Sequence, residues 1–128
     1  MISFILLLIA GFFNAIMDTL KTRYGTSIFN NLKNLKILDW VNPSMSNDNK
    51  WKNGDAKQGE KFFGSSTFLV WLTDLWHFAK MLMLTCIMLA VVLYSPWTPF
   101  LLLDAFFYYL SFTIIFELFY KYFFIDRK

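Results

Sequence analysis

Two long apolar segments in the second half of the chain constrain its fold more than any other feature. Residues 81–94 carry no charged side chain, and residues 100–124 carry only Asp104, Glu117 and Lys121. Residues 1–17 also lack charged side chains. Because a membrane-spanning helix needs roughly 20 predominantly apolar residues, the sequence predicts an all-α integral membrane protein with three transmembrane helices.

The composition supports this class. Hydrophobic residues make up 57% of the 128 residues, with 16 Phe, whereas charged residues make up only 16%. Soluble domains are about 25% charged, and a soluble chain this apolar would expose large adhesive patches. The net charge of +3 is then better explained by membrane topology than by nucleic-acid binding. The single Cys86 excludes a disulfide within one chain.

The chain is short enough to form a single membrane domain, residues 1–128. The first segment lacks a basic start and a small-residue cleavage site, so we expect a retained anchor. Ser65, Ser66 and Thr67 are candidate N-caps for the second helix, and counting back about 20 residues from Tyr94 places its inner membrane boundary near Asp74. The predicted segments are a first helix at about 2–18, a loop at about 22–63, a second helix at about 67–94 and a third helix at about 99–124.

The short connection at residues 95–99 predicts that the second and third helices form a tight antiparallel hairpin. Orientation follows from the basic residues, because cytoplasmic loops are enriched in Lys and Arg. The 22–63 loop and the C-terminus, with Arg127 and Lys128, are basic, whereas the 95–99 turn has no basic residue. We therefore expect a multi-pass membrane protein with its N-terminus outside and its C-terminus in the cytoplasm.

Residues 27–38 of the loop have apolar side chains at Ile28, Leu32 and Leu35, with Lys residues beside them. This spacing predicts a short amphipathic helix on the inner leaflet. Trp40 nearby is a candidate interface anchor.

Ionisable side chains at membrane depth are costly and usually have a function or a partner. Asp18, Asp74, His77 and Glu117 are all predicted to lie at the cytoplasmic end of the helices. Asp74 and His77 are three residues apart, so on a helix they face the same side and can share a proton or a ligand. We therefore predict a catalytic site of Asp74, His77 and Asp18.

The same three residues are candidate ligands for a divalent metal such as Zn, Mn or Fe, because imidazole and carboxylate groups suit these ions. Four polar or aromatic residues are candidates for a substrate-binding lid over this site: Asn14, Trp40, Asn42 and Asn53. The alternative is that headgroup water alone satisfies the cluster.

A second polar stripe lies along the third helix. Asp104, Tyr108 and Ser111 have helical spacing, and Glu117 follows at the cytoplasmic side. In an oligomer these residues are candidates for an ion or proton pathway. Hydrogen bonding between helices is the alternative explanation.

Several short motifs resemble a group of small uncharacterised bacterial and phage integral membrane proteins, which share a W-x-N-P…W-K-N loop and a T-D-x-W-H helix start. The resemblance covers residues 14–77, although this chain inserts residues 44–49 before the second Trp. It implies membership of that group and a shared site, without implying a particular reaction. The motifs are Asp18-Thr19-Leu20, Trp40-x-Asn42-Pro43, Trp51-Lys52-Asn53, Ser65-Ser66-Thr67 and Thr73-Asp74-x-Trp76-His77.

Three classes of function remain open. The first is a membrane-interface enzyme that uses a metal or acid–base site, and it predicts a loop folded over the cluster. The second is a homo-oligomeric ion or proton channel. The third is a membrane scaffold that docks a partner. The bilayer and further copies of the chain are the expected partners, and nucleic acid is not.

Overall fold

The protein, seen in a computed structural model, consists of helices joined by tight turns, and the residues described include no β-strand. The structure describes residues 1–127 except for the side chain of Leu35, so Lys128 and that side chain lie outside it. The helices are α1 (Ile2–Thr22), α2 (Leu35–Val41), α3 (Ser46–Lys50), α4 (Leu75–Val92) and α5 (Leu101–Leu118), which continues into a π-helical turn (Phe119–Phe123). Short 3₁₀ helices lie at Tyr24–Thr26, Ile28–Asn31, Pro43–Met45, Lys52–Gly54, Ala56–Gln58 and Val70–Leu72.

Three helices are long and apolar enough to cross a membrane. They are α1 with 21 residues, α4 with 18, and the helix Leu101–Phe123 with 23. At 1.5 Å per residue each spans about 27–35 Å, close to the thickness of a hydrocarbon core. The all-helical class and the three candidate spans therefore agree with the sequence-based prediction.

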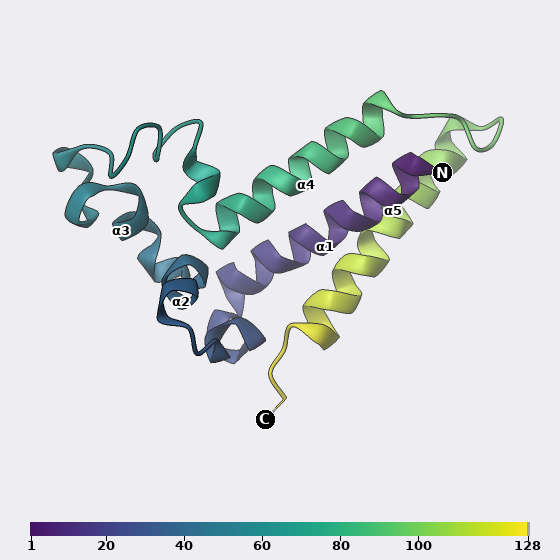
Figure 1. Ribbon diagram of the computed structural model, residues 1–128. Coiled ribbons are helices and arrows are strands. Elements are labelled where there is room, and N and C mark those ends of the chain that lie inside the picture. The colour runs from purple at the N-terminus through teal and green to yellow at the C-terminus, as the bar shows by residue number, and fades with distance from the viewer. Residues whose placement is uncertain (128) are drawn as a thin grey trace.

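Helix α1 lies between α4 and α5 (Figure 1). Ser3 near the start of α1 donates a hydrogen bond to the Leu93 carbonyl at 2.9 Å, so α1 and α4 are antiparallel. At the other end the Thr22 and Tyr120 hydroxyls are 3.0 Å apart, so α1 and α5 are parallel. The central position of α1 also agrees with burial: 39% of the residues in its apolar span are buried, compared with only 11% in the α4 span.

The predicted tight hairpin between the second and third helices is wrong. The two helices diverge from their connection, and α1 occupies the space between them (Figure 1). Small residues on α1 explain this arrangement, because they let a neighbouring backbone approach closely. A Cβ at Gly11 would lie only 2.4 Å from the Phe112 carbonyl oxygen of α5. Ala15 of α1 and Ala79 of α4 are both fully buried in one core.

Helix α4 begins at Leu75, not near residue 67 as predicted, and Asp74 is its N-cap. The preceding residues form turns because their polar groups have other partners. Ser65 donates its hydroxyl to the Lys50 carbonyl at 2.7 Å instead of capping a helix. The Glu60 carboxylate accepts hydrogen bonds from Ser66 and Gly64, which hold the pKa of Glu60 below its ordinary value. The predicted inner membrane boundary near Asp74 coincides with the start of α4, and its place in a membrane stays a prediction.

The single amphipathic helix predicted at 27–38 is replaced by 3₁₀ turns followed by α2. The chain turns there because it pairs with the C-terminal segment: the Ile28 amide donates to the Phe124 carbonyl at 3.1 Å. Leu35, one of the three predicted apolar positions, has its side chain outside the described residues. Val41 at the end of α2 joins the buried core with Leu20 and Phe124.

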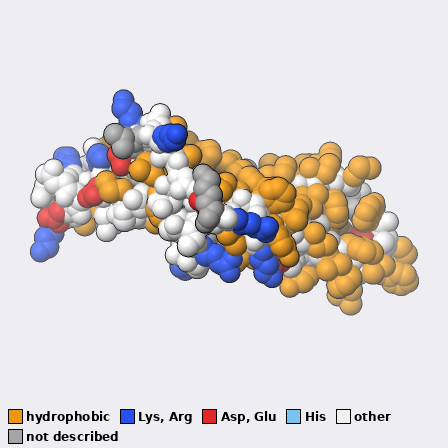
Figure 2. All heavy atoms as spheres, turned by 90° about the horizontal axis from the view of Figure 1, so that it is seen from below, with side chains coloured by type: hydrophobic (Ala, Val, Ile, Leu, Met, Phe, Trp, Pro, Cys, Tyr) orange, Lys and Arg blue, Asp and Glu red, His pale blue; other side chains and the backbone are white. Residues whose placement is uncertain are grey.

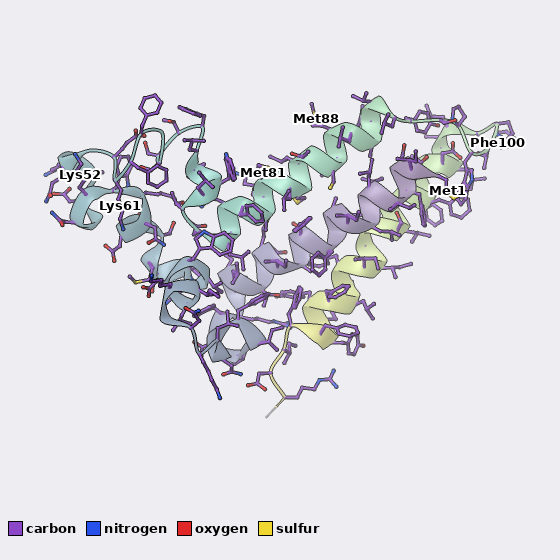
Figure 3. All side chains as sticks on the ribbon, viewed as in Figure 1. Met1, Lys52, Lys61, Met81, Met88 and Phe100 are labelled. Atoms are coloured by element: carbon purple, nitrogen blue, oxygen red, sulfur yellow. The ribbon has the colours of Figure 1, made fainter. Side chains whose placement is uncertain are left out.

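The surface divides into two parts along the length of the molecule. In the view from below, apolar side chains cover the end with the helix bundle, whereas Lys and Arg side chains gather toward the loop end (Figure 2). Lys52 and Lys61 lie at that loop end, far from Met1 and Phe100 at the opposite end (Figure 3). The ends of α1 and α5 and the start of α4 therefore lie near the basic part of the protein.

Candidate functional site

The Asp74 carboxylate is buried at the N-terminus of α4. Its side chain accepts the backbone N–H of His77 at 2.9 Å, as an N-cap does. Only 2% of Asp74 is exposed. The carboxylate also accepts hydrogen bonds from the hydroxyls of Ser46 at 2.8 Å and Thr73 at 3.1 Å. These contacts fix the carboxylate in one orientation.

The His77 ring is oriented by Asp74. Its Nδ1 lies 2.8 Å from both carboxylate oxygens of Asp74. A carboxylate can only accept there, so Nδ1 donates to Asp74. The Nζ of Lys50 lies 3.3 Å from Nε2. The predicted pairing of Asp74 and His77 is therefore present.

The loop supplies two residues to this pair, and both come from α3. Ser46 and Lys50 are four residues apart, so the helix presents them on one side. Ser46 contacts Asp74 and Lys50 contacts His77. Two hydrogen bonds to the Lys50 carbonyl position α3. One comes from the Lys61 amide at 2.9 Å and the other from the Ser65 hydroxyl.

A pocket of about 270 Å³ opens beside the pair, and it is called the polar pocket below because four of its six lining residues carry polar side chains, although most of its wall is apolar. Lys21 reaches it from the end of α1, and Lys50 is not among its lining residues. Its lining residues are Lys21, Pro43, Ser46, Asp74, Trp76 and His77. The arrangement can orient an imidazole, accept a proton on Nε2 and stabilise an anionic oxygen nearby.

The pKa of Asp74 reflects competing effects. Burial is the largest and by itself raises the pKa, but hydrogen bonds from the His77 side chain, the His77 amide and Ser46 outweigh it. The result is a pKa lowered from 3.8 to about 2. Asp74 therefore stays ionised over the whole physiological range and holds a fixed negative charge beside His77.

Asp18 and Asn14 do not join this network. Within residues 1–127, no hydrogen bond or ion pair connects either side chain to Asp74 or His77. No group of three or more His, Cys, Asp and Glu in the described part of the chain has a metal-binding arrangement. The structure thus brings together two of the three predicted ligands, and Asp18 is not beside them.

The predicted lid residues have separate structural roles. Trp40 donates its Nε1–H to the Leu72 carbonyl at 3.0 Å, and its ring lies 5.6 Å from that of Phe78 on α4. Asn42 caps the Pro43–Met45 turn that leads into α3. Asn53 donates to the Gln58 side chain at 2.8 Å, away from Asp74. Trp40 and Asn42 position the loop, and neither side chain contacts the Asp74–His77 pair.

The predicted pathway residues are spread along α5, and each has a local partner. Asp104 is fully buried and accepts hydrogen bonds from the Tyr94 hydroxyl and from the amides of Trp97 and Thr98. It therefore holds the connection between α4 and α5. The other members are locally paired: Tyr108 contacts Tyr94 by its ring, Ser111 donates to the Tyr108 carbonyl, and Glu117 pairs with Lys121.

Sequence reasoning missed Ser46, Lys50 and Lys21. The spacing of Ser46 and Lys50 is a helical signal, but α3 has only five residues and its sequence, SNDNK, has no apolar face. Lys21 lies three residues after Asp18, so it shares roughly the same side of α1. Basic residues of the loop indicate membrane topology by their number alone. That pattern does not indicate that Lys21 lines the pocket or that Lys50 contacts His77.

Comparison with known proteins adds no relative: no family model, no curated protein and no solved structure matches the chain.

Proposed function

We propose that the chain is an enzyme of the membrane interface that hydrolyses an ester or phosphoester bond near the lipid headgroups. The observation that carries this proposal is the orientation of His77, whose Nδ1 is held by buried Asp74 while its Nε2 faces Lys50. A fixed carboxylate–imidazole pair is the arrangement that acid–base catalysis requires. The loop residues that close on the pair also fit an enzyme better than a passive anchor.

In this proposal the Lys50 ammonium moves from His77 Nε2 to the attacked group when substrate binds, so Nε2 is free to take a proton from water, and the oxygen of that water attacks the carbonyl carbon or the phosphorus. The bond to the leaving alcohol breaks, and the alcohol oxygen takes the proton back from His77. Asp74 holds the ring and stabilises the imidazolium that forms in between. Lys50 and Lys21 stabilise the negative charge that develops on the attacked group.

The site would face the cytoplasmic leaflet, with the N-terminus outside. The distribution of basic residues supports this orientation. The motif resemblance to small bacterial and phage membrane proteins is compatible with a site at Asp74 and His77, because the T-D-x-W-H motif contains both residues.

The experiment uses the full chain in nanodiscs that contain phosphatidylglycerol and phosphatidylethanolamine, with products followed by lipid mass spectrometry. We expect H77Q to lower the rate by about 100-fold or more, because it removes the proton acceptor. D74N keeps the N-cap, since Asn also accepts the His77 amide, but it replaces one acceptor oxygen with an NH₂ group, so it tests the charge together with the orientation of the His77 ring. E117Q is the matched control, and it should leave the rate unchanged. A rate that H77Q does not change would refute the proposal.

The ion-channel alternative predicts that the control variant E117Q has an effect. In a channel, E117Q at the mouth would alter conductance, whereas H77Q and D74N would act only through local charge. The hydrogen bonds that immobilise Asp104 do not favour this function.

A further inference from the structure

A second, apolar groove runs along the outer side of α4. Its volume is about 540 Å³, and its lining is almost entirely apolar. Met81 and Met88 mark this side of the helix (Figure 3). Trp71 and Val70, from the turn before α4, close its loop end. The remaining lining residues follow helical spacing: His77, Lys80, Leu84, Thr85, Leu89 and Val92.

His77 lines both this groove and the polar pocket beside Asp74. The two spaces therefore meet at one imidazole, with the apolar groove on one side and the pocket that contains Lys21 and Asp74 on the other. A molecule that filled both would have an apolar tail and a polar head, and its junction would lie at His77. A membrane lipid has this shape.

The cations at the junction indicate the charge of the head. Lys80 lies at the loop end of the groove and stacks on the Trp76 ring, with Nζ 5.2 Å from the ring centroid. Lys50 lies 3.3 Å from His77 Nε2. Among the described residues, Asp74 is the one carboxylate that lines either space, and its oxygens already accept hydrogen bonds from His77 and Ser46. An anionic phosphate complements this set of charges, whereas a cationic head does not.

The length of the groove fits a lipid tail. From His77 to Val92 the helix rises about 22 Å, and one leaflet of a hydrocarbon core is about 15 Å deep. The groove is long enough for one acyl chain with its phosphate at the loop end.

We infer that α4 binds a single anionic glycerophospholipid, with an acyl chain along Met81–Met88 and the phosphate at Lys80, His77 and Lys50. This inference rests on the proposed function in one respect, because it names the substrate class of that site. Binding is measured as lipid retained by the protein and turnover as product formed, so the two can fail separately.

The test is native mass spectrometry of the full chain released from nanodiscs with equal amounts of phosphatidylglycerol and phosphatidylcholine. We expect the wild-type protein to retain phosphatidylglycerol preferentially. K80Q should lower that preference about fivefold, because one Lys near a membrane surface contributes about 1 kcal/mol toward an anionic lipid. K121Q is the matched control, because it removes a Lys from the π-helical turn after α5. It should retain the preference.

A second variant tests the tail rather than the head. T85W fills the middle of the groove from an exposed position and leaves the charges in place. It should lower lipid retention while thermal stability stays close to that of the wild type. Equal retention of both lipids by the wild type, or unchanged retention in both K80Q and T85W, would overturn the inference.

The competing occupant of this face is a second copy of the chain. In a C86S background, M88C would then form a disulfide between copies in the membrane. Efficient 88–88 crosslinking would overturn the lipid assignment, and its absence together with lipid retention supports it. Lipid retention without any turnover would refute the proposed enzyme but leave the binding site in place.

Discussion

The two buried carboxylates of this protein, Asp74 and Asp104, lie at opposite ends of the bundle. Each accepts at least two hydrogen bonds from backbone or side-chain donors, so neither is an isolated charge. Their surroundings nevertheless differ. Asp104 contacts only the turn that it holds, whereas Asp74 contacts an imidazole that borders a pocket. Chemistry is therefore expected at Asp74 and structural stabilisation at Asp104.

The low pKa of Asp74 predicts a specific acid sensitivity. A carboxylate whose pKa is lowered on folding stabilises the native state above its unfolded pKa, and this stabilisation is lost as the pH falls through the folded pKa. With a pKa of 3.8 falling to about 2, Asp74 contributes ~2 kcal/mol near neutral pH, lost between about pH 4 and 2. Unfolding in detergent as a function of pH should show this slope in the wild type.

D74N should reduce the slope in that pH window, while other carboxylates keep theirs. The comparison therefore uses the difference between the two proteins. Identical pH profiles would mean that Asp74 has an ordinary pKa in the folded state.

Asp104 makes a different prediction. D104N keeps one acceptor oxygen but turns an NH₂ group toward the amides of Trp97 and Thr98, so at least one buried donor loses its partner. The expected cost is about 1–3 kcal/mol of stability. Y94F, which removes a single hydrogen bond to Asp104, should cost less. If D104N changed ion conductance with no loss of thermal stability, the pathway function would be supported instead.

At the scale of elements, the position of α1 decides the arrangement of the bundle. Gly11 lets α5 approach so closely that even a Cβ would meet the Phe112 carbonyl at 2.4 Å. The obstacle is backbone rather than a flexible side chain, so it cannot move aside without shifting a helix. The same element carries Lys21 to the polar pocket.

G11V should therefore separate α1 from α5 and destabilise the fold by about 1–3 kcal/mol, as overpacking does. G11A should have a smaller effect of the same sign. G25A is the control, because a Cβ at Gly25 meets no atom within 4 Å. Thermal unfolding in detergent measures all three, and a neutral G11V would show that the two helices do not pack through this glycine.

At the scale of the whole molecule, the basic loop end and the apolar bundle lie at opposite ends of one axis, which we expect to follow the membrane normal. We expect the loop end to be cytoplasmic. Single cysteines in a C86S background test this: K52C should react only with permeant reagents on whole cells, and S95C should react with impermeant ones. Labelling of K52C by an impermeant reagent would reverse the orientation.

The exposure of α4 and α5 bears on assembly. Only 11% of each of these spans is buried within one chain, and α1 lies between the two helices (Figure 1). We propose that the protein forms homo-oligomers through α5, since α4 is assigned to lipid. Light scattering of the purified protein in mild detergent and in nanodiscs should give a mass of two or more chains. A monodisperse monomer in both would count against assembly.

The sequence by itself determined the class of the fold, the three long apolar helices and the pairing of Asp74 with His77. These are local properties, because apolar length and i, i+3 spacing act within one helix. The tertiary structure alone decided which helix lies in the centre. It also decided that Asp18 stays apart and that Ser46, Lys50 and Lys21 complete the site. Those outcomes depend on close approach between backbones and on turns closed by distant partners, such as Ser65 with Lys50, and neither leaves a periodic signal in the sequence.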